Sequence, residues 1–238
     1  MMKKKILILL IAGGFVSLYF FSTERHLFVD GNETYEIIKQ DNNDRYNGIG
    51  REIVENKDGY FSTFTTVLEN EKTYIEYKQN GDASWSDNSY FGGKMKDTGC
   101  GITSLAIILS GYQMGYTPED LRKKYYPVLD GNQISKELSN TFNISNTDFF
   151  FDSDHLSNEY IIEHLKSNRP VLICLWNKPS NNRWTTESHY MVLLATDGYD
   201  MVYVSNPNGL LNDSKSSGWY NINEITPYLA KALYIEEY

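Results

Sequence analysis

The sequence is poor in the residues on which several classes of protein depend. Only two of its 238 residues are cysteine, which excludes a scaffold of several disulfides but leaves one bridge, between Cys100 and Cys174, open. The four histidines are scattered and give no ligand spacing for zinc, and no glycine-rich loop of the kind that cradles phosphate occurs. We therefore expect neither a metal ion nor another cofactor.

Positive charge is also scarce. The chain has 22 Lys and Arg against 31 Asp and Glu, a formal charge of -9. Residues 1–22 contain three lysines and no acid, so the rest of the chain carries -12. Because proteins that bind nucleic acid present basic patches, this balance argues against nucleic acid as a partner.

The one long apolar run lies at the N-terminus. Lys3, Lys4 and Lys5 precede 16 uncharged residues, 6–21. This run is long for the apolar core of a signal peptide and short for a membrane-spanning helix, which needs roughly 20 residues. We expect residues 1–22 to be a signal peptide or an N-terminal membrane anchor, and the aromatic end of the run favours the anchor. Both interpretations place the rest of the chain outside the cytoplasm, membrane-anchored or secreted.

Residues 23–75 have the composition of a stalk or accessory region. Two runs within or near it, 60–69 and 73–77, are rich in β-branched and aromatic residues, and the residues between them suit a turn. The sequence predicts a β-hairpin here. A separate domain is expected over residues 76–238.

Cys100 lies between two glycines at the start of an apolar segment. Apolar residues recur after it at spacings of three and four, which predicts a buried helix: Ile102, Leu105, Ala106 and Leu109. At the start of a helix, free backbone N–H groups and the helix dipole stabilise a thiolate, the nucleophilic form of cysteine. The alternative is a small core residue, which is the usual role of a free cysteine.

Helices are predicted before strands in the rest of the domain. Short helices are expected near 117–125, 132–142 and 157–166, followed by strands at 171–176, 189–195, 201–205, 217–222 and 232–235, with a short helix near 224–229. This order indicates an α+β fold. Cys174 lies within the first of these strands and is expected to be a core residue.

His189 and Asn206 are candidates for the remaining groups of a nucleophilic site. His189 opens a strand directly after a polar loop, so its ring can face a cleft. Asp197-Gly198 predicts that this strand pairs with strand 201–205, which Asn206 follows. The Asn206 amide oxygen can then accept the Nδ1–H of His189 and fix its tautomer. The alternatives are a polar residue at a strand start and a plain Asn-Pro turn.

Residues 99–106, Gly-Cys-Gly-Ile-Thr-Ser-Leu-Ala, resemble the nucleophile motif of the bacteriocin-processing (double-glycine) peptidases, a group of papain-like cysteine peptidases. The resemblance extends to Ser-His-Tyr-Met-Val at 188–192, Val-Ser-Asn-Pro at 204–207 and Ser-Gly-Trp-Tyr at 217–220. It implies a papain-like α+β fold, in which an N-terminal helical part with the nucleophile helix packs on a C-terminal antiparallel β-sheet.

The same resemblance implies that Cys100, His189 and Asn206 are catalytic. Related peptidases often have Asp where Asn206 stands, whereas papain has Asn. Papain-like enzymes also use a glutamine six residues before the cysteine as an oxyanion donor, and this sequence has Lys94 there. Gln79 is the candidate substitute, with the backbone N–H of Cys100 as the other donor.

These features predict an exported cysteine peptidase that cleaves peptide amide bonds through a Cys–His–Asn acyl-enzyme mechanism, with peptides or proteins as substrates. A thiolate–imidazolium pair between Cys100 and His189 is expected across neutral pH. Two alternatives stay open: a cell-wall peptide amidase with the same residues, and a non-catalytic binding module that kept the fold, which Lys94 would favour. Labelling by a thiol-reactive probe at neutral pH separates an enzyme from such a module.

Overall fold

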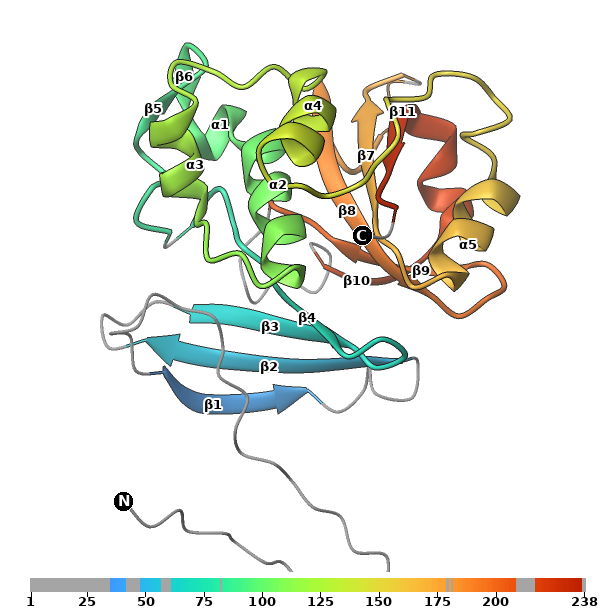
Figure 1. Ribbon diagram of the computed structural model, residues 1–238, viewed down its shortest axis with the longest axis horizontal. Coiled ribbons are helices and arrows are strands. Elements are labelled where there is room, and N and C mark those ends of the chain that lie inside the picture. The colour runs from blue at the N-terminus through green and yellow to red at the C-terminus, as the bar shows by residue number, and fades with distance from the viewer. Residues whose placement is uncertain are drawn as a thin grey trace, which may run out of the picture.

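The computed structural model describes residues 35–41, 48–56, 61–81, 83–178, 180, 182–208 and 217–236. The described chain forms a four-stranded sheet followed by a larger body of helices and strands (Figure 1). The predicted signal peptide or anchor, residues 1–22, lies outside the described residues. Among the described helices, none has the length and apolar character needed to cross a membrane.

The N-terminal sheet is an antiparallel meander. Its strands pair in chain order: β1 (Tyr35–Asp41), β2 (Ile49–Asn56), β3 (Phe61–Val67) and β4 (Lys72–Ile75). The pairing of β3 with β4 is the hairpin that the sequence predicted. Strands β1 and β2 are not predicted by the sequence pattern, because their charged residues obscure the alternation of apolar and polar residues that is typical of a half-buried strand.

The body is built on a five-stranded antiparallel sheet in the order β10-β9-β8-β7-β11. Its strands are β7 (Val171–Trp176), β8 (Ser188–Thr196), β9 (Met201–Ser205), β10 (Gly218–Asn221) and β11 (Leu229–Tyr234). Its helices are α1 (Met95–Thr98), α2 (Cys100–Gly111), α3 (Pro118–Lys124), α4 (Gln133–Asn140) and α5 (Asn158–Lys166), and a small ribbon is formed by β5 (Ser89–Tyr90) and β6 (Gly93–Lys94). Helices that precede an antiparallel sheet confirm the predicted α+β class.

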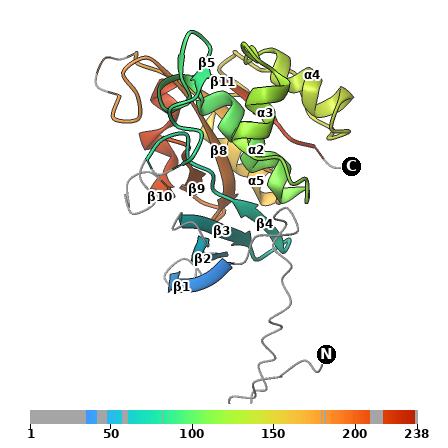
Figure 2. The same cartoon turned by 90° about the vertical axis from the view of Figure 1, so that its left-hand side faces the viewer.

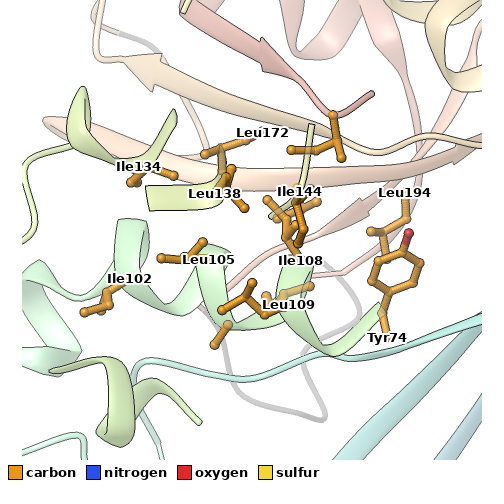
Figure 3. Close-up of a cluster of buried hydrophobic side chains, with 14 of the residues drawn as sticks. Tyr74, Ile102, Leu105, Ile108, Leu109, Ile134, Leu138, Ile144, Leu172 and Leu194 are labelled. Carbon is orange, nitrogen blue, oxygen red and sulfur yellow. The ribbon is translucent and has the colours of Figure 1, made fainter. Parts of the chain in front are cut away.

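Alternating side chains of the sheet form two hydrophobic cores. Leu172 and Leu194 face α2 and belong to one cluster with Ile102, Leu105 and Leu109 of that helix (Figure 3). Their strand neighbours, Val171 and Leu193 among them, pack on the opposite face with residues of α5. The predicted all-round burial of α2 is confirmed, since every residue from Ile102 to Gly111 is buried.

The N-terminal sheet is docked against the C-terminal end of α2. The backbone N–H of Ile75 donates to Ser110 Oγ at 2.8 Å, and the Tyr74 ring lies where a Cβ on Gly111 would be, 2.1 Å from its Cε1. A larger residue at position 111 would displace this ring, so glycine there permits the close approach. Figure 2 shows the sheet at one end of the body, with β4 leading into it.

Local sequence signals hold in one case and fail in another. Thr117 caps α3 through a capping box with Asp120, an arrangement that its Thr-Pro-x-Asp sequence favours. The helix expected near 224–229 is instead two 3₁₀ turns, η2 (Ile222–Glu224) and η3 (Thr226–Tyr228). Pro227 has no N–H to donate back to the preceding turn, which prevents a continuous α-helix.

Candidate active site

Cys100 is the first residue of α2, as predicted. Gly99 caps the helix without a side-chain hydrogen bond, so no side chain occupies the backbone N–H groups of the first turn. A Cβ on Gly99 would lie 2.5 Å from the Met95 carbonyl oxygen, which explains the glycine there. Cys100 is partly exposed, whereas Cys174 is 2 % exposed within β7. Both are free cysteines, so the bridge left open by the sequence is not formed.

The surroundings of Cys100 favour the neutral thiol in the resting protein. Burial raises the pKa of the Cys100 thiol, and hydrogen bonds from the backbone N–H groups of Tyr190, Gly101 and Cys100 itself lower it only in part. Tyr190 directly follows His189 in β8, so the thiol lies against the backbone of the strand that carries the histidine.

His189 and Asn206 are brought together at the end of the β8–β9 pair. Both side chains are buried, with 3 % and 4 % exposed, and His189 Nε2 lies 2.6 Å from Asn206 Oδ1. Asn206 follows β9 directly, and the antiparallel pairing of β8 with β9 returns the chain to the start of β8. The structure therefore places this pair together by sheet register.

The structure corrects the prediction of which His189 ring nitrogen bonds to Asn206. We expected Nδ1 to donate to Asn206, whereas Nε2 does so. The same Oδ1 accepts the backbone N–H of Asn208 at 2.9 Å, which identifies this end of the amide as the oxygen. Nε2 must then carry the proton in the neutral ring, and Nδ1 keeps the lone pair that can accept another proton.

Burial also keeps His189 neutral. The pKa of His189 is lowered to about 4, chiefly by desolvation and to a smaller extent by the ammonium of Lys78, and the Asn206 hydrogen bond offsets only part of this. Within the described chain no hydrogen bond joins the Cys100 thiol to the His189 ring. The predicted thiolate–imidazolium pair is thus not the resting state that the structure favours, because burial outweighs the charge-stabilising contacts at both groups.

Gln79 lies between the Asn206 loop and the segment that leads into α2. Its backbone N–H donates to the Pro207 carbonyl at 2.9 Å, and its Nε2 donates to the Lys96 carbonyl at 2.8 Å. Gln79 is 2 % exposed, so this amide is held in one place. An amide nitrogen has two hydrogens, and the bond to Lys96 uses one of them.

Lys94, at the position where papain-like enzymes have glutamine, is turned to the surface. Its Nζ donates to Asp87 at 2.9 Å, and half of its side chain is exposed. The lysine that stands six residues before Cys100 therefore forms an exposed ion pair with Asp87.

The sequence does not predict several polar residues that form a buried network at the backbone of Asn206. Glu76, Lys78 and Ser217 are all buried there. Glu76 and Lys78 follow β4 with no motif to mark them, and Ser217 was noted only as the start of a strand and of the Ser-Gly-Trp-Tyr motif. Charged residues in a short linker are usually solvated, so the sequence carried no signal for their burial.

The fold is that of a papain-like domain: a helix that begins at a cysteine packs on an antiparallel sheet that carries a histidine and an asparagine. The family model of the Peptidase_C39 like family matches residues 72–226, and the chain belongs to this family. The match spans Gln79, Cys100, His189 and Asn206. Membership indicates a cysteine peptidase acting on peptides or proteins. No curated protein and no solved structure matches the chain.

Proposed function

We propose that this protein is an exported cysteine peptidase that cleaves peptide amide bonds through Cys100, His189 and Asn206. The observation that carries the proposal is the Nε2 to Oδ1 hydrogen bond of 2.6 Å between His189 and Asn206. It leaves Nδ1 of His189 as the only ring nitrogen able to accept a proton. The next residue of the strand, Tyr190, contacts the Cys100 thiol through its backbone N–H.

The resting state of neutral groups suggests attack and proton transfer in one step. As the Cys100 sulfur forms its bond to the substrate carbonyl carbon, Nδ1 of His189 takes the thiol proton. This requires the two side chains to close to hydrogen-bond distance in the substrate complex, as catalytic contacts often do on binding. Asn206 keeps the ring oriented and accepts from Nε2–H while the imidazolium exists.

The remaining steps return the proton. The carbonyl oxygen gains negative charge, which the backbone N–H of Cys100 and the second N–H of Gln79 Nε2 are proposed to stabilise. His189 then gives its Nδ1 proton to the leaving amine as the C–N bond breaks, leaving a thioester on Cys100. Water attacks the thioester with His189 as base, which releases the acid product and restores the thiol.

A peptide library with a mass-spectrometric readout tests the activity. The full chain is expected to cleave a subset of peptides, and Cys100→Ala is expected to cleave none while keeping its melting temperature. Cleavage of cell-wall peptides alone would favour the amidase alternative. A chain that cleaves neither set and does not react with a thiol probe at neutral pH would be a non-catalytic module.

Export is proposed from the three lysines and the apolar run of residues 6–21. Protease added to intact cells should digest the segment from residue 23 onward if it is anchored outside, and the medium should contain it if it is released. Recovery of the full-length chain in a protease-resistant cytosolic fraction would contradict export.

A further inference from the structure

A buried ammonium group contacts the backbone of Asn206, the asparagine of the proposed site. Lys78, 7 % exposed, follows β4 in the linker to the body. Its Nζ donates to the backbone carbonyl of Asn206 at 2.7 Å and to Ser217 Oγ at 3.0 Å. A charged donor gives a stronger hydrogen bond than a neutral one, so this contact fixes the Asn206 carbonyl firmly.

Ser217 holds the other backbone group of the same residue. The Asn206 N–H donates to Ser217 Oγ at 3.1 Å. Both backbone polar groups of Asn206, which directly follows β9, are therefore hydrogen-bonded to buried side chains: the carbonyl to Lys78 and the N–H to Ser217. Because Asn206 has left the strand ladder, these two side chains decide where its amide points.

Glu76 supplies the counter-charge for this arrangement. Burial raises the pKa of Glu76, but the charges of Lys78 and Arg51, with hydrogen bonds from Ser217 and Thr65, bring it below its ordinary value. The carboxylate also accepts from Tyr203 Oη at 2.7 Å. Glu76 is therefore ionised at neutral pH and supplies a negative charge to balance Lys78.

The N-terminal sheet contributes to the same network. Arg51 of β2 places its Nε 3.8 Å from Glu76 Oε1, and the Thr65 hydroxyl of β3 donates to that oxygen. The linker is also tied to the Asn206 loop beyond Lys78, through Gln79 N to Pro207 O at 2.9 Å and Asn80 Nδ2 to Asn208 Oδ1 at 2.8 Å. A path of polar contacts thus runs from β2 and β3 to the Asn206–His189 pair.

Stability alone does not account for these buried charges. The cost of desolvating two ions commonly exceeds their attraction, and apolar residues of similar volume often stabilise a core as well or better. A requirement for a fixed Asn206 does account for them.

We propose that Lys78 is a positioning residue for the Asn206–His189 pair, with Glu76 and the N-terminal sheet as its anchor. This inference rests on the proposed function only for its effect on rate. The orientation of the His189 ring is measurable whether or not the chain is a peptidase, so the two proposals can fail separately.

The test compares two variants of the full chain with a matched control. Lys78→Met removes the ammonium but leaves Glu76 buried with less compensation, so it is prone to misfold. The double variant Glu76→Gln/Lys78→Met removes both charges and lets the new amide oxygen accept from Tyr203 and Thr65. Lys166→Met, which changes an exposed lysine of α5, is the control.

Two readouts decide the outcome. In ¹⁵N spectra of labelled histidine, assigned with His189→Gln, wild type and Lys166→Met should show Nε2 protonated and Nδ1 free. The double variant should populate both tautomers, and its rate of Cys100 alkylation by iodoacetamide should fall roughly 10- to 100-fold, the scale expected when a catalytic group is misplaced.

A double variant that folds by circular dichroism and keeps the wild-type His189 spectrum would overturn the inference. If instead the spectra change as expected but His189→Ala leaves alkylation of Cys100 unchanged, the positioning role stands and the proposed function fails.

Discussion

His189 donates through Nε2 to Asn206 Oδ1 across 2.6 Å, and the same oxygen accepts the backbone N–H of Asn208 at 2.9 Å. One amide oxygen thus closes the turn after β9 and fixes the histidine tautomer. The short side chain of Asn206 cannot satisfy one partner without also placing the other. The geometry of the turn and the direction of the His189 ring are therefore coupled.

The first prediction concerns this coupling. Asn206→Ala should lower the free energy of unfolding by about 1–3 kcal/mol, because a buried N–H of His189 loses its acceptor. It should also slow Cys100 alkylation by iodoacetamide at pH 7, though less than His189→Ala does, since asparagine orients the ring and carries no charge. Asn208→Ala is the comparison variant, because it keeps the backbone N–H that donates to Asn206 and removes only the exposed hydrogen bond from Asn80 Nδ2. Equal rates for Asn206→Ala and wild type would remove Asn206 from the site.

The second prediction separates the two cysteines. Iodoacetamide should modify Cys100 in the folded chain and leave Cys174 unmodified, since Cys174 is buried in β7 and burial raises the pKa of its thiol to about 11. Cys100→Ala should abolish labelling with little change in melting temperature. Cys174→Ala should cost roughly 1–3 kcal/mol of stability, as expected for a cavity in a core, and should still label at Cys100. Peptide mapping by mass spectrometry after labelling measures both sites.

Local patterns in the sequence were sufficient to place Cys100 at the start of its helix. The glycines around Cys100 and the apolar repeat after it predicted both the start of α2 and its burial, because helix periodicity and capping are properties of neighbouring residues. The strand partners of His189 and Asn206 followed from a turn of four residues between β8 and β9. These parts of the site depend on short-range signals.

Other parts of the site depend on contacts between distant residues. Which ring nitrogen of His189 meets Asn206 depends on the direction from which the loop after β9 approaches, and no spacing in the sequence encodes that. The charge state of Cys100 and His189 depends on how completely the fold removes water from them. Lys78 and Glu76 are ordinary linker residues by sequence, and their burial depends on the tertiary packing of the folded chain.

The third prediction concerns stability against pH. The pKa of His189 falls from 6.5 to about 4 in the folded chain because of burial and Lys78. Between these values the unfolded chain binds the proton and the folded chain does not, so the stabilisation is present above pH 6.5 and is lost as the pH falls to about 4. The loss from this group is roughly 3 kcal/mol at most.

Denaturant unfolding at pH 7.5, 6, 5 and 4 measures this loss, with His189→Gln as the comparison. The free energy of unfolding of the wild type should fall more steeply between pH 6.5 and 4 than that of the variant. His164, whose pKa burial also lowers to about 4, contributes the same trend to both proteins and cancels in the difference. Parallel curves would show that His189 is not neutralised by burial.

The last prediction tests Gln79 against Lys94 as the side chain that serves the oxyanion. Gln79 Nε2 donates to Lys96 O at 2.8 Å and keeps one hydrogen for another acceptor, while Lys94 Nζ is committed to Asp87 at the surface. Gln79→Ala should reduce kcat on a peptide from the library about 10²- to 10³-fold with KM little changed, because the lost donor acts on charge that develops only in the transition state. Lys94→Gln should keep kcat within about twofold, since a side chain that points away from the site contributes nothing to it. Gln79→Glu gives a further control of the same size, in which the donor is replaced by a group that can only accept when ionised, and it should be as slow as Gln79→Ala. A clear gain in activity with Lys94→Gln, together with full activity of Gln79→Ala, would assign the oxyanion donor to the position that papain-like enzymes use and reject Gln79.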